Sequence, residues 1–183
     1  MDIGCFHPKW ISNTHLLYKA GWQGTVCDVD IWKTKPFKIF RPGVQIVTAG
    51  ILPANSSNGS DTLYRFRRFL SEWDTFSKEE ANCIKKRWGS DFDVIKVPTL
   101  SIDYVLEKIY SNNNRINFLN IDVEGLDDKI LATIDFNRFP IDIIAFEDNV
   151  NLKGSSEIQL ILATSNYSHI ASVGGTHIYV FTE

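Results

Sequence analysis

The sequence lacks several features that would place the protein in a special class. No apolar run reaches the roughly 18 residues that cross a bilayer, and the N-terminus has no apolar segment typical of a secretion signal. Cysteine is scarce: Cys5, Cys27 and Cys83 are an odd number without metal-ligand spacing. We therefore expect a reducing, cytoplasmic compartment, in which Cys5 and Cys27 are small buried hydrophobes.

An excess of positive charge is also lacking. The chain has 19 Lys and Arg against 22 Asp and Glu, a formal net charge of −3. Because no global basic field would attract a polyanion, we expect neither nucleic acid nor a membrane as partner. The oligomeric state is not indicated by any pattern in the sequence.

Short apolar strands alternate with helical segments along all 183 residues, a length that suits one domain, residues 1–183. The pattern predicts nearly continuous apolar strands at 24–30, 44–52, 93–99, 116–122 and 141–148, and a possible strand at 62–70. It predicts helices at 13–22, 77–89, 100–110, 125–134 and 155–166, and a broken helix at 32–43, interrupted by Pro36. This alternation favours an α/β fold with a mostly parallel sheet and helices on both faces. Residues 168–183 predict an antiparallel hairpin around Gly174 and Gly175.

Acidic residues follow several of these strands at the point where each strand ends. The pairs are Asp28 and Asp30, Asp122 and Glu124, and Glu147 and Asp148. Ligands of open parallel sheets bind outside the carboxyl ends of the strands, where an acid can accept hydrogen bonds from ribose hydroxyls. The N-terminal turn, with Asp2 and Gly4, permits close approach of a ligand to the backbone. Together these features indicate a nucleoside-containing ligand, although Asp122 could serve only as a helix cap.

Two segments, "DIGCFHPKWISNTHLLYKAGWQGTVCDVD" and "INFLNIDVEGLDDKIL", resemble the FkbM family of S-adenosylmethionine-dependent methyltransferases. The likeness covers nearly the whole chain and is most specific at the Asp-x-Gly-x-x-x-Pro loop and at Ile121-Asp122-x-Glu124-Gly125. It implies a class I methyltransferase fold, Rossmann-like, in which the last strand of a seven-stranded sheet is antiparallel. It also implies O-methylation of a hydroxyl on a sugar, a glycan or a secondary metabolite. The family's first strand begins several residues before the acid matched by Asp2, so we expect a truncated first strand or a domain from a longer protein.

The resemblance also implies which residues bind S-adenosylmethionine: Asp2, Gly4, Cys5, Phe6, Asn13, Thr14, Asp28, Val29, Asp30 and Asp122. Among them, Asp28 matches the acid that binds the ribose hydroxyls. Asn13 and Thr14, at a helix start, should meet the cofactor carboxylate.

Asp122 and Glu124 are the candidate catalytic residues, with Glu124 orienting or deprotonating the acceptor hydroxyl. Glu147 is a candidate for binding a sugar hydroxyl. His7 and Trp73 are further candidates for substrate binding, although His7 could be a plain loop residue and Trp73 could serve in core packing. The segments 55–73 and 77–88 depart from a minimal alternating fold and should shape the acceptor site.

Two other interpretations remain open from the sequence. The chain could be a non-catalytic Rossmann-like module that binds a nucleoside or a partner protein. Alternatively, it could be a Mg²⁺-dependent O-methyltransferase in which Asp122, Glu124 and Glu147 supply oxygen ligands. The metal-free O-methyltransferase is the main interpretation, with no metal ligand assigned.

Overall fold

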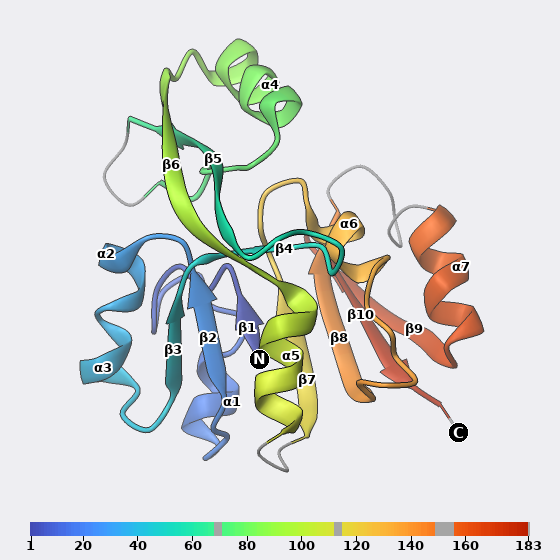
Figure 1. Cartoon of the computed structure of the whole chain (residues 1–183). Coiled ribbons are helices and arrows are strands. Elements are labelled where there is room, and N and C mark those ends of the chain that lie inside the picture. The colour runs from blue at the N-terminus through green and yellow to red at the C-terminus, as the bar shows by residue number, and fades with distance from the viewer. Residues whose placement is uncertain (68–70, 112–114, 149–155, 183) are drawn as a thin grey trace.

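A computed structural model describes residues 1–67, 71–111, 115–148 and 156–182, which fold around a seven-stranded sheet (Figure 1). The strands occur in the order β3-β2-β1-β7-β8-β10-β9. Their bounds are β1 Asp2–Ile3, β2 Thr25–Asp28, β3 Gln45–Thr48, β7 Ile116–Ile121, β8 Ile141–Glu147, β9 Tyr167–Val173 and β10 Thr176–Phe181. The first five of these pair in parallel, whereas β10 runs antiparallel to β8 and β9. The predicted mostly parallel α/β sheet with antiparallel C-terminal strands is confirmed.

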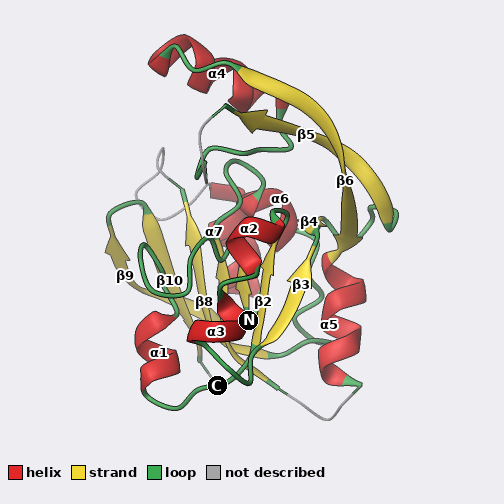
Figure 2. Cartoon of the chain, turned by 90° about the vertical axis from the view of Figure 1, so that its left-hand side faces the viewer, coloured by secondary structure: helices red, strands yellow, loops and turns green. Residues whose placement is uncertain are grey.

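Helices cover both faces of this sheet. They are α1 His15–Lys19, α2 Ile31–Thr34, α3 Phe37–Phe40, α5 Ile102–Tyr110, α6 Asp127–Leu131 and α7 Ser156–Thr164. Viewed along the sheet, α1 and α5 lie on opposite faces (Figure 2). Pro36 separates α2 from α3, as predicted, because proline lacks the N–H that would continue the helix. Asp30 and Ser101 begin α2 and α5 by accepting a hydrogen bond from a backbone N–H of the first turn.

The central strands are apolar because both of their faces are covered. Leu119 and Ile121 of β7 and Ile144 and Phe146 of β8 are completely buried in the main core. Truncating such a side chain to alanine removes about 2–5 kcal/mol of stability. This rigid core fixes the positions at which the strands end and their acids emerge.

A second, three-stranded sheet was not predicted. It has the order β4-β6-β5, with β4 Gly50–Leu52, β5 Gly59–Phe66 and β6 Phe92–Ser101. We call β5, β6, the intervening α4 (Lys78–Trp88) and the segment 71–77 the arm; it stands over the carboxyl end of the main sheet (Figure 1). The predicted single strand at 44–52 is wrong, because the chain leaves β3 at Ala49 and enters the second sheet as β4.

The long antiparallel pairing of β5 with β6 builds the arm, and its register runs from Gly59–Thr99 to Phe66–Phe92. The strand predicted at 62–70 thus begins earlier, and its positions 68–70 lie outside the described residues. Ser77 caps α4 by accepting from the Glu80 N–H, and Gly89 ends it in the left-handed conformation, both typical helix boundaries.

Candidate active site

A cavity of about 260 Å³ lies where the parallel strands end beneath the arm. The main sheet and its loops contribute Gly4, Phe6, Asp28, Val29, Asp122, Glu124 and Glu147, while α2 contributes Lys33 and the arm contributes Asp74 and Phe76. This is the edge of an open parallel sheet at which ligands bind. The cavity therefore combines the predicted strand-end acids with side chains from a separate sheet.

Gly4 brings the turn after β1 into direct contact with the end of β7. Its φ is +77°, and a Cβ built there would lie 1.7 Å from the carbonyl oxygen of Asp122. Both the backbone conformation and the close approach therefore exclude any other residue. The N–H groups of Gly4 and Cys5 both donate to the Cys27 carbonyl (2.9 and 3.1 Å), which fixes the turn against β2.

Asp28 ends β2 beside this turn and is buried. Its Oδ2 accepts from the Phe6 N–H (3.2 Å), and its Oδ1 accepts from the Asp30 N–H (3.0 Å). Lys33 Nζ lies 3.9 Å from Oδ1. Burial raises the pKa of Asp28, although Lys33 and the two backbone N–H groups oppose the change. A carboxylate has about four lone-pair sites, so Asp28 can still accept hydrogen bonds from a ligand.

Three carboxylates converge at the other end of the cavity. One oxygen each of Asp122, Glu124 and Glu147 lies within 4.8 Å of the other two. The strand β8 delivers Glu147, whereas Asp122 and Glu124 sit on the turn after β7. Glu124 and Gly125 adopt φ values of +51° and +90°, which turn the chain sharply toward α6. The sequence placed these acids at strand ends without showing that they converge, and the structure brings the three together.

The electrostatics of this acidic cluster favour a positively charged ligand. Burial, followed by the charge of Glu147, raises the pKa of Asp122 to about 8. The same two causes raise the pKa of Glu124 to about 8. Burial, with a smaller contribution from the charge of Glu147, raises the pKa of the neighbouring Asp127 to about 7, while hydrogen bonds from backbone N–H groups oppose the change. A cation placed among these groups would relieve the repulsion and restore their ionised forms.

The arm fixes the position of the turn after β7, which carries Asp122 and Glu124. The buried Thr75 hydroxyl donates to the Glu124 carbonyl oxygen (2.6 Å) and accepts from the Ser77 N–H (3.0 Å). A Cβ on Gly125 would meet Glu80 Cγ of α4 at 3.4 Å. The positive φ of Glu124 is therefore fixed by contacts from a segment about 50 residues away.

A second polar network joins the arm to the Asp28 end of the cavity. Lys33 is only 5% exposed and lies 3.9 Å from both Asp28 and Asp74. Arg65 of β5 lies 3.7 Å from Asp74 and from Asp30. Burial raises the pKa of Asp74, against the opposing charges of Lys33 and Arg65. The cavity is thus acidic at the Glu124 end and mixed in charge at the Asp28 end.

Three residues predicted to bind the cofactor, Asp2, Asn13 and Thr14, belong to a separate, partly buried hydrogen-bond network. Asp2 is 3% exposed, accepts from the Thr14 hydroxyl (2.5 Å) and the Asn120 amide (3.0 Å), and does not line the cavity described above. Asn13 donates to the Asn120 side-chain oxygen (3.0 Å). Arg41 donates to Thr14 Oγ1 (2.8 Å) and completes the network. Its members tie α1 and α3 to the central strands.

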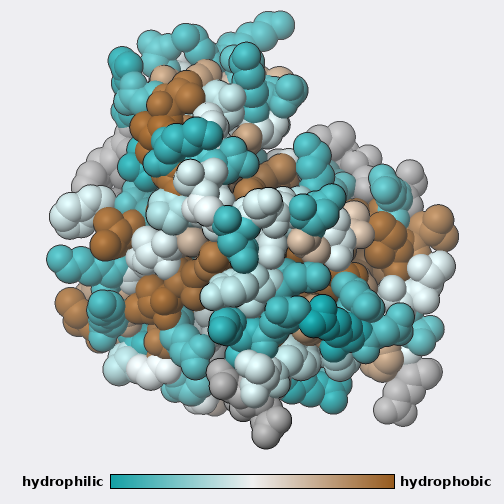
Figure 3. Space-filling model, in the orientation of Figure 1, coloured by the Kyte–Doolittle hydropathy of each residue, from teal (hydrophilic) through white to brown (hydrophobic). Residues whose placement is uncertain are grey.

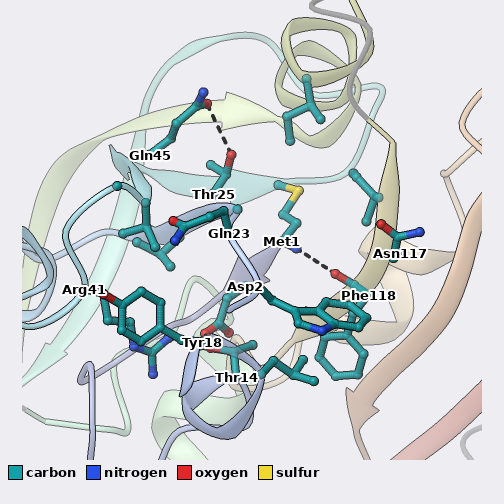
Figure 4. A pocket seen from close by; sticks show the side chains of 18 of the residues that line it. Met1, Asp2, Thr14, Tyr18, Gln23, Thr25, Arg41, Gln45, Asn117 and Phe118 are labelled. Carbon is teal, nitrogen blue, oxygen red and sulfur yellow. Dashed lines mark hydrogen bonds between the residues drawn. The ribbon is translucent and has the colours of Figure 1, made fainter. Parts of the chain in front are cut away.

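Asp2, Thr14 and Arg41 line a second cavity of about 270 Å³, at the amino ends of β2, β3 and β7 (Figure 4). The Met1 ammonium group donates to the Phe118 carbonyl there (2.6 Å), as the dashed line in Figure 4 shows. The strand β1, with two residues, separates this cavity from the one that holds Asp28.

The remaining predicted site residues lie in different surroundings. Cys5 is buried and packs with Val26 and Phe37. His7 stacks on Trp10, with ring centroids 4.3 Å apart, and its Nδ1 accepts from the Lys9 and Trp10 N–H groups.

Trp73 lies within the arm, where it stacks on Trp88 at 6.0 Å and meets the edge of Phe66. The side chain of Asp30 caps α2, and Val29 borders the cavity.

Sequence reasoning missed Lys33, Asp74 and Thr75. Lys33 follows Asp28 by five residues, a proximity that could have suggested a charge partner. Asp74 and Thr75 carried no comparable signal, because their role depends on the long-range pairing of β5 with β6.

A family profile described as Methyltransferase FkbM domain matches residues 2–167. The chain belongs to the FkbM methyltransferase family. Comparisons with curated proteins and with solved structures gave no match. The predicted family is confirmed, and with it a methyltransferase that uses S-adenosylmethionine.

The cavity at the strand ends fits this cofactor in its chemistry. Asp28 has lone pairs to spare for ribose hydroxyls, and the backbone at Gly4 allows close approach. The cluster of Asp122, Glu124 and Glu147 suits the positive charge of a sulfonium. The cavity volume of about 260 Å³ is slightly below the range for small-molecule sites, roughly 300–1,000 Å³.

Proposed function

We propose that this methyltransferase transfers a methyl group to a hydroxyl of a sugar, a glycan or a secondary metabolite, with Glu124 as the general base. S-Adenosylmethionine, when bound, supplies a methyl group on a positively charged sulfur, which leaves with the electron pair of the broken bond. The acceptor oxygen forms the new bond to carbon, and its proton passes to the Glu124 carboxylate. We further propose Asp28 as the ligand of the ribose hydroxyls and Asp122 as the acid nearest the reacting end.

The observation that carries this proposal is the convergence of Glu124 with Asp122 and Glu147 within 4.8 Å at the end of the cavity, where burial and the charge of Glu147 raise the pKa of Glu124 to about 8. An ordinary carboxylate is a weak base for an alcohol, whereas a general base works best with a pKa near the operating pH. Because the base must be ionised, we expect the rate to rise as the pH increases toward 8. A bound sulfonium would shift this rise to lower pH, since a positive charge stabilises the carboxylate.

Glu147 and the arm support an acceptor that carries several hydroxyl groups. Glu147 lies within 4.8 Å of the proposed base and can accept a second hydroxyl. Asp74 and Lys33 add further polar groups to the cavity wall. Sugar-like acceptors match this density of hydrogen-bonding groups better than apolar ones.

The test is methyl transfer from labelled S-adenosylmethionine to a panel of hydroxylated sugars and glycans, with matching amines as a comparison. We expect label in at least one hydroxylated acceptor, and a loss of about 10²–10⁴-fold in Glu124→Gln. Glu157→Gln, an exposed acid of α7, is the matched control and should retain full activity. Transfer only to amines, or full activity of Glu124→Gln, would refute the proposed reaction.

A second candidate function follows from the three converging carboxylates, since they offer oxygen ligands, which Mg²⁺ prefers, within 4.8 Å of one another. In that case Asp122, Glu124 and Glu147 act as ligands, and the metal rather than Glu124 activates the hydroxyl. Treatment with a chelator separates the two mechanisms. Turnover lost with chelator and restored by Mg²⁺ supports the metal mechanism, and unchanged turnover supports Glu124 as the base. A folded protein that binds the cofactor but labels no acceptor would favour the non-catalytic module.

A further inference from the structure

Large apolar side chains are exposed on the face formed by α2, α3 and the loop between β1 and α1. These residues, which we call the apolar face, are Trp10 (71% exposed), Ile11 (81%), Ile31 (58%), Trp32 (63%), Ile39 (75%) and Phe40 (43%). Figure 3 shows brown side chains at the left of the molecule, where α2 and α3 lie. A soluble protein does not gain stability from such exposure, so the face requires another explanation.

Direct contacts make this face continuous. Arg41, which follows α3, donates from Nε to the Pro8 carbonyl (2.7 Å) and thereby holds the loop against α3. Lys9 Nζ lies over the ring of Phe40, 4.2 Å from its centroid. The helices α2 and α3 are separated by only two residues and lie on the same side of the molecule (Figure 2).

The face is also large and locally strained. Its three aromatic residues alone expose roughly 350 Å², if each carries about 150–250 Å² of surface. With the isoleucines added, the area reaches the upper range of patches on monomers, roughly 300–600 Å². Ile11 adopts φ +48°, which is rare for a β-branched residue. Such strain, at the most exposed side chain of the face, is typical of functional positions.

The charge around this face is positive, in contrast to the whole chain. Residues 1–60 carry six cations (Lys9, Lys19, Lys33, Lys35, Lys38 and Arg41) and three acids (Asp2, Asp28 and Asp30), against a net charge of −3 overall. Asp2, Asp28, Lys33 and Arg41 are buried, so the exposed charges of this segment are four lysines (Lys9, Lys19, Lys35 and Lys38) and the partly exposed Asp30, which caps α2. Lys35 lies 5.7 Å from the centroid of the Trp32 ring, so the lysines border the aromatic side chains.

We propose that the apolar face docks on an anionic membrane surface. Tryptophan, isoleucine and phenylalanine insert at the boundary between headgroups and acyl chains, and adjacent lysines bind anionic lipids. No helix in the described part of the chain is long and apolar enough to span a bilayer, so this contact is peripheral. We expected no membrane partner because the net charge of the whole chain is negative. That value does not show that residues 1–60 carry a net positive charge.

Docking would place the cavity next to the membrane, because Ile11 belongs both to the apolar face and to the cavity lining. The acceptor would then be a hydroxylated headgroup carried by a lipid. This consequence rests on the proposed function, whereas the docking itself does not.

The test is cosedimentation of the protein with vesicles of phosphatidylcholine alone or mixed with phosphatidylglycerol. We expect binding to the anionic vesicles that weakens at high salt. The double variant Trp10→Ser/Trp32→Ser should bind at least tenfold more weakly, since each inserted aromatic contributes substantial apolar area. Lys9→Glu/Lys38→Glu should weaken binding by about fivefold for each lysine. Trp88→Ser is the matched control, because Trp88 is 59% exposed but lies on the arm.

Circular dichroism and thermal melting should show that every variant folds. The proposal would be overturned if the protein bound neither kind of vesicle. It would also be overturned if Trp88→Ser lost as much vesicle binding as Trp10→Ser/Trp32→Ser. A concentration-dependent dimer that Trp10→Ser/Trp32→Ser converts to monomer, measured by analytical ultracentrifugation, would assign the face to a second copy instead. Methyl transfer to water-soluble acceptors can be measured separately, so failure of docking is distinguishable from failure of the proposed function.

Discussion

Replacement of Glu124 by glutamine should make the free protein more stable, and the gain should depend on pH. The folded-state pKa of Glu124 is about 8, because the group is buried and faces the charge of Glu147. In the unfolded chain it titrates near its ordinary value of 4.5. Between pH 4.5 and 8 the unfolded chain has lost this proton while the folded protein retains it. Stability of the wild type therefore falls as the pH rises through this window.

The size of the effect follows from the pKa values. One pKa unit corresponds to about 1.4 kcal/mol, so the upper limit at pH 7.5 is about 4 kcal/mol. Partial solvent access and relaxation of the cluster reduce this value, and we expect a gain of about 1–3 kcal/mol for Glu124→Gln. In a chain of this length, 1 kcal/mol shifts Tm by about 2–4 °C. The variant should therefore melt about 3–10 °C higher at pH 7.5, but at the same temperature as wild type at pH 4.

Differential scanning fluorimetry across pH 4 to 9 measures this difference directly. For Glu157→Gln, the melting temperature relative to wild type should not increase with pH, since this acid is exposed on α7. If Glu124→Gln were equally or less stable than wild type at pH 7.5, the proposed repulsion within the acidic cluster would be wrong. Addition of S-adenosylmethionine should reduce the difference, because its positive charge stabilises the ionised wild-type cluster.

Three further changes test how the cavity is held together. Gly4→Ala should prevent folding or abolish cofactor binding, because its Cβ would lie 1.7 Å from the Asp122 carbonyl oxygen; circular dichroism and calorimetry distinguish the two results. Thr75→Val should lower kcat and shift the pH profile, since it removes the hydrogen bond to the Glu124 carbonyl, whereas Thr75→Ser should restore both. Arg41→Met should destabilise the fold by about 2–4 kcal/mol in urea unfolding, because it removes three hydrogen bonds and leaves the buried Pro8 carbonyl without its donor. If a variant kept the wild-type value of the property measured for it, the role assigned to the contact that it disrupts would be wrong.

The sequence predicted those features that depend on local pattern. Apolar runs ending in acids identified β2, β7 and β8, and they placed Asp28, Asp122 and Glu147 at one edge of the sheet. These positions follow because parallel strands all end at the same edge. The breaks at Pro36 and Gly89 also followed from backbone chemistry.

Features that depend on distant contacts could not be predicted in this way. The arm exists because β5 pairs with β6 across the intervening α4, and pairing partners are not encoded in the local pattern of either strand. The contact of Thr75 with Glu124 and the proximity of Lys33 to Asp74 depend on that pairing. The hydrogen bonds that Asp2 accepts from Thr14 and Asn120 likewise join segments far apart in the sequence.

The acidic cluster connects stability with function in this methyltransferase. Asp122 and Glu124 are held close together although their repulsion disfavours the ionised forms. Binding of a ligand with a positively charged sulfur would relieve this repulsion, whereas binding of the product, whose sulfur is neutral, would not. We therefore expect S-adenosylmethionine to bind more tightly than S-adenosylhomocysteine, which lacks the positive sulfur.

Calorimetric titration with S-adenosylmethionine and S-adenosylhomocysteine, on wild type and Asp28→Ala, is the most direct measurement. Asp61→Ala, an exposed acid of β5, serves as the matched control. We predict micromolar binding of S-adenosylmethionine to wild type and to Asp61→Ala, and its loss in a folded Asp28→Ala. Absence of binding to the folded wild-type chain, or unchanged binding in Asp28→Ala, would contradict the assignment of the cofactor to the cavity at the strand ends.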